Sequence, residues 1–167
     1  GVWCEQYHPD TGEGLRMTSR ADIEAFFQSR AYAVIGVSSD RRKFGNSVFR
    51  TMKEKGFTVY PVHPVSETVE GEKCYRSVAD LPPGVESIVT VVPPAATEAV
   101  IREAVTKGIR HVWMQPGSSS AAGAKAARDG GATVVEGDCI LMFLEPVESI
   151  HALHRLIKKL FGKYPLT

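Results

Sequence analysis

The chain has 167 residues, of which 43% are apolar and 23% charged, and its 20 lysines and arginines nearly balance its 19 aspartates and glutamates. This size and composition are typical of one folded domain and exclude intrinsic disorder. The balanced charge argues against a nucleic-acid partner, and no run approaches the roughly 18 apolar residues of a membrane span.

The first 18 residues predict an irregular amino-terminal segment. They lack the basic-then-apolar pattern of a signal peptide. The three cysteines, Cys4, Cys74 and Cys139, are too few and too far apart for a disulfide framework. Together these features predict a cytoplasmic location, where thiols stay reduced.

From residue 19 onward, short β-branched runs alternate with helical stretches, which is typical of βαβ units around a parallel sheet. We expect strands at 31–37, 57–62, 87–92, 111–115 and 132–136. We expect helices at 19–30, 46–55, 95–107 and 121–129, with a polar loop at 65–73 and a helical turn at 77–81. Serines precede two of these helices as natural caps, namely Ser19 and the run from Ser118 to Ser120.

This alternation predicts an α/β fold with a Rossmann-like, doubly wound, mostly parallel sheet of five to six strands in a single domain over residues 19–146. The expected strand order is that of a Rossmann sheet, 3-2-1-4-5. In such sheets ligands bind beyond the carboxyl ends of the strands, at the topological switch point. An amphipathic helix within 147–167 is expected to pack on the same domain, since its apolar residues recur at helical spacing.

The loop after the first strand is the strongest candidate site. Gly36 leaves the strand and Gly45 opens the next helix, whose free N–H groups and partial positive charge favour a phosphate close to the glycine backbone. Hydroxyl donors and consecutive cations lie between them: Ser38, Ser39, Arg41, Arg42 and Lys43. We therefore expect a phosphate group in this loop.

Two features argue against NAD as the ligand. Eight residues separate Gly36 from Gly45, which departs from the G-x-G-x-x-G fingerprint. His63 also stands at the end of the second strand, where an NAD enzyme carries an acidic residue for the ribose.

The third long strand ends at Val92-Pro93-Pro94. Prolines there leave no N–H groups and form a flat apolar wall, which suits an adenine or an acyl chain. The same prolines also fit a simple strand stop followed by a helix start, and both interpretations remain open.

These stretches together resemble the CoA-binding domain family, which is related to the CoA-binding amino-terminal domain of the succinyl-CoA synthetase alpha subunit. The resemblance covers residues 31–143. It is carried by AVIGVSSDRRKFGNSVFRTMKEKGF, VYPVHP, VEGEKCYRSVADLP, VTVVPPAATEAVIREAVTKGIRHVWMQPGSSS and VVEGDCILMF.

The resemblance implies that coenzyme A lies across the strand ends. The loop 36–45 would hold its phosphates, His63-Pro64 would lie near the adenosine, and the proline turn would pack against the nucleotide. Residues 117–118 open a helix that can receive a second anionic group. The predicted cofactor contacts are Gly36, Val37, Ser38, Ser39, Arg41, Arg42, Lys43, Phe44, Gly45, Asn46, His63, Pro64, Val92, Pro93, Pro94, Thr97, Gly117 and Ser118.

The chain departs from the family pattern at the second strand. The family often has asparagine at the position of His63 and a lysine just after the following proline, where this chain has Val65-Ser66. A basic partner for the CoA 3′-phosphate must therefore come from elsewhere, and Arg41, Arg42 and Lys43 are the candidates. The synthetase's second domain, with its phosphorylated histidine, has no counterpart here, so ligase activity of this chain alone is not implied.

No complete catalytic constellation is visible, and no catalytic residue is predicted. Cys139, which follows Asp138, is either a nucleophile near the CoA thiol or a small buried residue. The pairs His151–His154 and Cys4–His8 lack the further ligands of a zinc site, so no metal is predicted.

The leading interpretation is a stand-alone binding or regulatory module for coenzyme A or an acyl-CoA, not an enzyme. One alternative is an NADP-linked enzyme, or an acyl-CoA-dependent enzyme that uses Cys139. Another is the CoA-binding subunit of a two-chain ligase, docked through the carboxyl-terminal helix. A homodimer or a complex with a partner protein is compatible with this interpretation.

Overall fold

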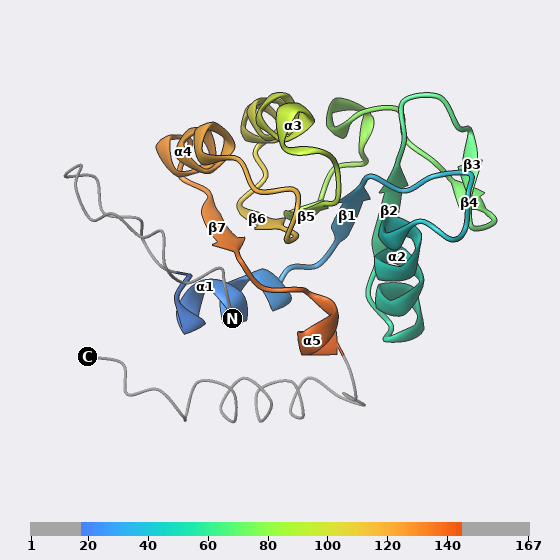
Figure 1. Cartoon of the computed structure of the whole chain (residues 1–167), viewed down its shortest axis with the longest axis horizontal. Helices are drawn as coiled ribbons and strands as arrows, with labels where there is room; N and C mark the ends of the chain where they lie inside the picture. Colours follow the sequence, from blue (N-terminus) through green and yellow to red (C-terminus); the bar gives the residue numbers. More distant parts are fainter. Residues whose placement is uncertain (1–17, 145–167) are drawn as a thin grey trace.

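β-Branched runs at the predicted positions form five short strands in one sheet (Figure 1). They are β1 (Tyr32–Ile35), β2 (Val59–Val62), β5 (Ser87–Thr90), β6 (His111–Met114) and β7 (Thr133–Glu136). Their order across the sheet is β2-β1-β5-β6-β7, and every neighbouring pair is parallel. This confirms the predicted α/β class with a Rossmann-like parallel sheet.

The structure, a computed structural model, describes residues 18–144. The helix expected at 147–161 and the segment 1–17 lie outside the described residues, so the predicted boundaries of the domain stay a prediction. No helix among residues 18–144 is long and apolar enough to cross a membrane.

Helices and turns connect the strands close to the predicted positions. They are α1 (Arg20–Phe27), α2 (Phe44–Glu54), η1 (Val78–Asp80), α3 (Pro94–Lys107) and α4 (Ala121–Asp129). A short further helix after β7, α5 (Leu141–Leu144), was not expected. Ser19 caps α1 by accepting from the Asp22 N–H at 3.1 Å, and Ser120 caps α4 by accepting from Gly123 at 3.0 Å. Gly108 ends α3 in the left-handed conformation, at φ +89°.

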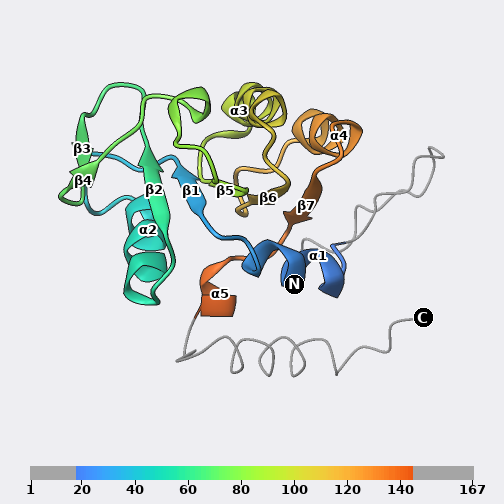
Figure 2. The ribbon, with the colours of Figure 1, turned by 180° about the vertical axis from the view of Figure 1, so that it is seen from behind.

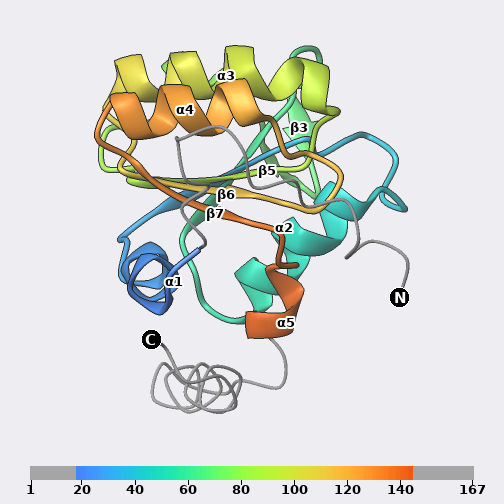
Figure 3. The same ribbon diagram turned by 60° about the vertical axis from the view of Figure 1, so that its left-hand side comes forward.

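Helices cover both faces of the sheet. Figure 3 shows α3 and α4 along one face, and α1, α2 and α5 on the other. Trp113 of β6 anchors the second face, where its ring meets the edges of Phe26, Phe27 and Phe143. These buried apolar layers fix the strands, so that the polar loops at the strand ends have a rigid base.

The edge of the sheet beyond β2 differs from the Rossmann order expected from the sequence. Residues within the predicted polar loop 65–73 form a small antiparallel hairpin, β3 (Thr68–Val69) and β4 (Glu72–Lys73), which lies beyond β2 in Figure 2. The chain then returns alongside β2, where Tyr75 forms a single parallel bridge to Val62. The expected order 3-2-1-4-5 is therefore wrong for the five predicted strands, because β5, the third of them, pairs with β1 and does not lie beyond β2.

The switch point lies between β1 and β5, because the chain leaves β1 toward β2 on one side and continues from β5 toward β6 on the other. The loops after β1 and β5 therefore diverge at the carboxyl edge of the sheet. Helices α2 and α3 begin at that edge, and this is where a ligand is expected.

Candidate functional site

The two glycines of the loop after β1 bring backbones together. Gly36 has φ +115°, and a Cβ there would lie 2.7 Å from the carbonyl carbon of Val91. A Cβ at Gly45 would collide with the backbone of Gly36 and lie 3.1 Å from the Val37 nitrogen. From the sequence, Gly45 was expected to let a phosphate approach its backbone closely. Its open side instead faces β1, so its absent side chain permits close packing of α2 on the strand exit.

Asn46 holds the loop from inside. Its side chain is fully buried, and its Oδ1 accepts from the Ser38 N–H at 2.8 Å while its Nδ2 donates to the Ser38 carbonyl at 2.8 Å. The amide thus pairs with both backbone groups of one residue, as a strand neighbour would. Asn46 was predicted as a cofactor contact, and the structure places its side chain behind the loop, turned toward the protein.

Glu70 joins the same cluster from the turn of the β3–β4 hairpin. Its carboxylate accepts from Arg50 Nη1 at 2.7 Å, Asn46 Nδ2 at 3.1 Å and Arg41 Nε at 3.1 Å. Burial by itself raises the pKa of Glu70, but the hydrogen bonds from Asn46 and Arg50 and the two arginine charges lower it further than burial raises it. Glu70 therefore stays ionised, and it ties the β1–α2 loop to the hairpin.

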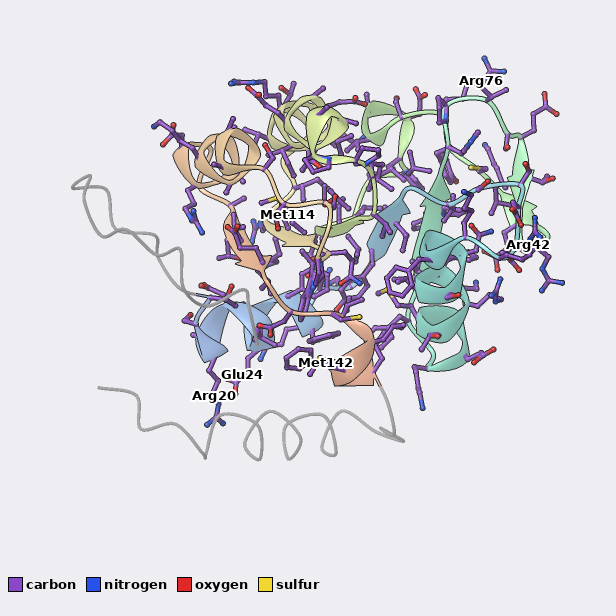
Figure 4. The ribbon with its side chains drawn as sticks, in the orientation of Figure 1. Arg20, Glu24, Arg42, Arg76, Met114 and Met142 are labelled. Carbon is purple, nitrogen blue, oxygen red and sulfur yellow. The ribbon has the colours of Figure 1, made fainter. Side chains whose placement is uncertain are left out.

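The other loop cations have different surroundings. Arg42 folds back on Asp40, with Nε 3.0 Å from Oδ1 and Nη2 3.1 Å from Oδ2. Hydrogen bonds from the Arg42 side chain and N–H lower the pKa of Asp40. Lys43 is exposed, and its amine forms no ion pair with any residue in 18–144. Figure 4 shows Arg42 near the β3–β4 end of the molecule, well away from Met142 on α5.

The amino terminus of α2 is open to an anion. The first N–H groups of a helix have no acceptor within the helix, and no side chain caps α2. α3 likewise has no side-chain cap, but it begins with Pro94, which has no N–H to offer. Since Ser120 already caps α4, α2 is the best of the three for a phosphate.

His63, at the end of β2, builds a turn. Its Nδ1 accepts from the N–H groups of Val65 at 3.1 Å and Ser66 at 2.9 Å. A ring nitrogen that accepts two N–H groups carries no proton of its own, so the proton of the neutral ring is on Nε2. The half-buried His63 thus fixes the loop that leads into the hairpin.

Three buried hydroxyls connect the loops after β5 and β6. Thr97 Oγ1 donates to the Ser118 carbonyl at 2.7 Å, and Ser118 Oγ donates to Thr90 Oγ1 at 3.0 Å. All three residues are buried. Thr97 and Ser118 were predicted cofactor contacts, and the structure instead turns their hydroxyls into the protein, where they hold α3 against the next loop.

The loop after β7 is held by the loop after β6. Gln115 Oε1 accepts from the Ile140 N–H at 2.8 Å, and its Nε2 donates to Cys139 Sγ at 3.4 Å. The indole of Trp113 donates to the carbonyl of Asp138 at 2.8 Å. Burial raises the pKa of the Asp138 carboxyl. The thiol of Cys139 is half-buried, and its hydrogen-bond partner is the side-chain amide of Gln115.

The predicted contacts divide by exposure. Those exposed at the edge are Ser39, Arg41, Arg42, Lys43, Phe44, Pro64, Pro93, Pro94 and Gly117. Those half-buried are Gly36, Ser38, His63 and Val92, and those buried are Val37, Gly45, Asn46, Thr97 and Ser118. Among residues 18–144 no group of three histidine, cysteine, aspartate or glutamate side chains is placed to hold a metal ion. The structure thus defines a Rossmann-like domain whose loop at the switch point carries three consecutive cations and leads into a helix with no side-chain cap.

The family follows from comparison with known proteins. The profile of the CoA binding domain family matches residues 30–145, and the chain belongs to this family. This confirms the resemblance inferred from the sequence.

Relatives and solved structures agree with the assignment. The alpha subunit of the ADP-forming acetate–CoA ligase II of Pyrococcus furiosus is 40% identical over 91 residues, which are 54% of this chain and 20% of that protein. A conserved hypothetical protein from Pyrococcus furiosus is 40% identical with a TM-score of 0.64, over 67% of this chain and 97% of that one. A hypothetical protein from Pyrococcus horikoshii OT3 is 30% identical with a TM-score of 0.71, over 79% and 94%. The chain thus spans about a fifth of the ligase subunit and nearly all of each hypothetical protein.

Proposed function

We propose that this protein binds coenzyme A or an acyl-CoA across the carboxyl edge of its sheet, as a binding or regulatory module in the cytoplasm. The observation that carries the proposal is the family match over residues 30–145, which includes every loop of that edge. CoA carries a pyrophosphate, a phosphate monoester and a flat adenine, and the edge offers a complement to each.

The loop after β1 supplies the polar part of this complement. The uncapped start of α2 offers N–H groups to the pyrophosphate. The neighbouring cations, Arg41 and Lys43, supply positive charge. Across the switch point the half-buried Val92 and the exposed Pro93 form an apolar surface for the adenine or the acyl chain. Thr97 and Ser118 act indirectly in this proposal, since they hold the loops that bear these groups.

A second role is favoured by the relatives. The ligase alpha subunit that this chain resembles is, by its name, one subunit of a larger enzyme, and the chain spans only a fifth of it. The protein would then supply its CoA site to a partner chain. Co-purification of a specific second chain supports this role, while a protein that purifies alone and binds CoA tightly supports the stand-alone module.

Calorimetric titration of the ligand-stripped protein with CoA tests the proposal. Dephospho-CoA, NAD and NADP are the comparison ligands. We expect saturable binding of CoA, weaker binding of dephospho-CoA and no comparable binding of NAD. The CoA affinity should fall as salt increases, because exposed charges contribute through screened attraction. No binding of CoA, or a preference for NADP, contradicts the proposal.

A further inference from the structure

We propose that Glu70 is a positioning residue that presents the guanidinium of Arg41 to the site, where Arg41 binds the phosphate monoester of the nucleotide. This inference rests on the proposed function, because it names the residue that reads the 3′-phosphate of CoA. The sequence leaves three cations open for this role, and their surroundings in the structure differ enough to choose among them.

The carboxylate of Glu70 is unusually enclosed for a residue in a hairpin turn. Its side chain is only 6% exposed, and it accepts from Arg50, Asn46 and Arg41. A buried carboxylate is stable only with such partners. Because Arg50 and Asn46 belong to α2 and fix one side of the carboxylate, the oxygens that meet Arg41 have a defined position.

Arg41 is fixed at two points and still faces solvent. Its Nε donates to Glu70, and its backbone carbonyl accepts from Arg50 Nη1 at 3.0 Å. Its side chain is nevertheless 74% exposed, and its terminal Nη1 and Nη2 form no hydrogen bond with any described residue. A guanidinium has five N–H donors in a rigid plane, so one held at Nε keeps the Nη edge for a second anion.

Arg42 and Lys43 lack this arrangement. The side chain of Arg42 is 90% exposed, and its Nε and Nη2 both donate hydrogen bonds to the carboxylate of Asp40, two residues earlier. Its charge is therefore paired locally, and its side chain forms no ion pair with any other residue in 18–144. The amine of Lys43 is a flexible point charge that no described residue orients. Of the three, only Arg41 is both oriented by the fold and open at its ligand-binding edge.

The backbone supports a specific role for Glu70. Glu70 has φ +52° and Gly71 has φ +76°, so both residues of the two-residue turn are left-handed. Such turns favour Asn-Gly or Asp-Gly, and a glutamate is uncommon at the first position. The turn conformation favours asparagine or aspartate at this position, whereas the longer side chain of Glu70 reaches both Arg50 and Arg41. An unfavourable backbone conformation kept for the sake of distant contacts is typical of a functional position.

The turn conformation and the contacts of Glu70 favour different side chains, so one substitution can preserve the turn while removing the contacts. Glu70→Asn suits the left-handed turn but is too short and uncharged, so the hairpin should fold while Arg41 loses its support. Glu70→Gln keeps the length and one acceptor oxygen, but it loses the charge and turns the other oxygen into an NH2 donor. Arg42→Ala is the matched control within the loop, and Arg102→Ala removes a cation paired with Glu98 on α3, away from the site.

The measured quantity is the ratio of the dissociation constant for dephospho-CoA to that for CoA, by calorimetry, with thermal melting of every variant. We expect wild type to prefer CoA by about tenfold or more, the value of one charge-assisted hydrogen bond. Arg41→Ala should bring the ratio close to one, and Glu70→Asn should lower it several-fold without loss of folding. Arg42→Ala and Arg102→Ala should leave it unchanged. Arg41→Ala combined with Glu70→Asn should lower the ratio no further than Arg41→Ala alone.

The outcomes separate this inference from the proposed function. If wild type binds no CoA, the proposed function itself fails. If CoA binds but Arg42→Ala abolishes the preference, or Arg41→Ala leaves it intact, Arg41 is not the phosphate reader. If Glu70→Asn weakens CoA and dephospho-CoA by the same factor, Glu70 is merely structural and its positioning role is refuted. Should Glu70→Asn fail to fold, Glu70→Gln supplies the test: we expect a smaller but measurable fall in the ratio, and equal weakening of both ligands again refutes the positioning role.

Discussion

Replacement of Asn46 by alanine should destabilise the protein strongly, because this side chain forms three hydrogen bonds from a fully buried position. Two of them pair with the N–H and the carbonyl of Ser38, and the third reaches the carboxylate of Glu70. Each buried hydrogen bond contributes about 1 kcal/mol net, and one to a charged group more. The expected loss in the free energy of unfolding is therefore about 3 kcal/mol, which lowers Tm by roughly 6–12 °C in a chain of this size.

A second substitution separates lost hydrogen bonds from lost volume. Asn46→Asp has nearly the same shape and can still accept from Ser38. However, its second oxygen would face the Ser38 carbonyl and the Glu70 carboxylate, both of which are acceptors. At neutral pH we expect it to be at least as destabilising as Asn46→Ala. The neighbouring Ser47, whose hydroxyl accepts one long bond of 3.4 Å from Arg50, is the matched control.

Thermal melting and urea denaturation of the three variants test this reasoning. Ser47→Ala should stay within about 0.5 kcal/mol of wild type, as surface substitutions usually do. Both Asn46 variants should also bind CoA more weakly, because the loop after β1 loses its internal support. A wild-type Tm for Asn46→Asp would show that the amide does not hold the loop, and the argument from hydrogen bonding would be refuted.

Three further outcomes can be measured by the same methods. Burial lowers the pKa of His111, so as pH falls below about 6.5 the imidazole becomes protonated in the unfolded chain before it does in the folded one. The free energy of unfolding should therefore decrease from pH 7 to pH 5, and His111→Gln should make it depend less on pH. Thr97→Val should cost about 1–2 kcal/mol, because the Ser118 carbonyl loses its buried donor, while Thr97→Ser should cost clearly less. Gly45→Ala should lower the stability by about 1–3 kcal/mol, since its Cβ would strike the backbone of Gly36, and a wild-type Tm there would contradict the close packing.

The sequence predicts the main strands and helices of this fold well, because the spacing of apolar residues and the residues that start and stop helices indicate the same boundaries. The β-branched runs, the serine caps and the stop at Gly108 give the strands and helices to within a few residues. The β3–β4 hairpin and α5 were not predicted. Strands of two residues and a helix of four are too short to show a period, and their positions depend on contacts with α2 and β2.

The location of the candidate site could be predicted from the sequence. Which of its residues are buried supports and which are exposed could not. Architecture alone places the loop after β1 at the switch point, and that loop lies there. The sequence predicted both Asn46 and Arg41 as cofactor contacts, with Arg41 one of three candidates for the 3′-phosphate. Tertiary contacts separate them, since Asn46 is fully buried and bonded to Ser38, whereas the side chain of Arg41 is mostly exposed. Glu70 escaped prediction because it lies 24 residues from Asn46 and 29 from Arg41, in a segment that reads as an ordinary polar turn.

His63, at the end of β2, holds its turn by hydrogen bonds that an asparagine side chain can also form. The family often carries asparagine here, and an asparagine oxygen commonly accepts the N–H groups of the residues that follow it in a turn. In this chain the imidazole Nδ1 does the same for Val65 and Ser66. Unlike an asparagine, the imidazole also carries an Nε2–H donor. Val65 and Ser66, which follow at this turn, carry no charge, whereas the loop after β1 carries three consecutive cations, one of which, Arg41, pairs with Glu70.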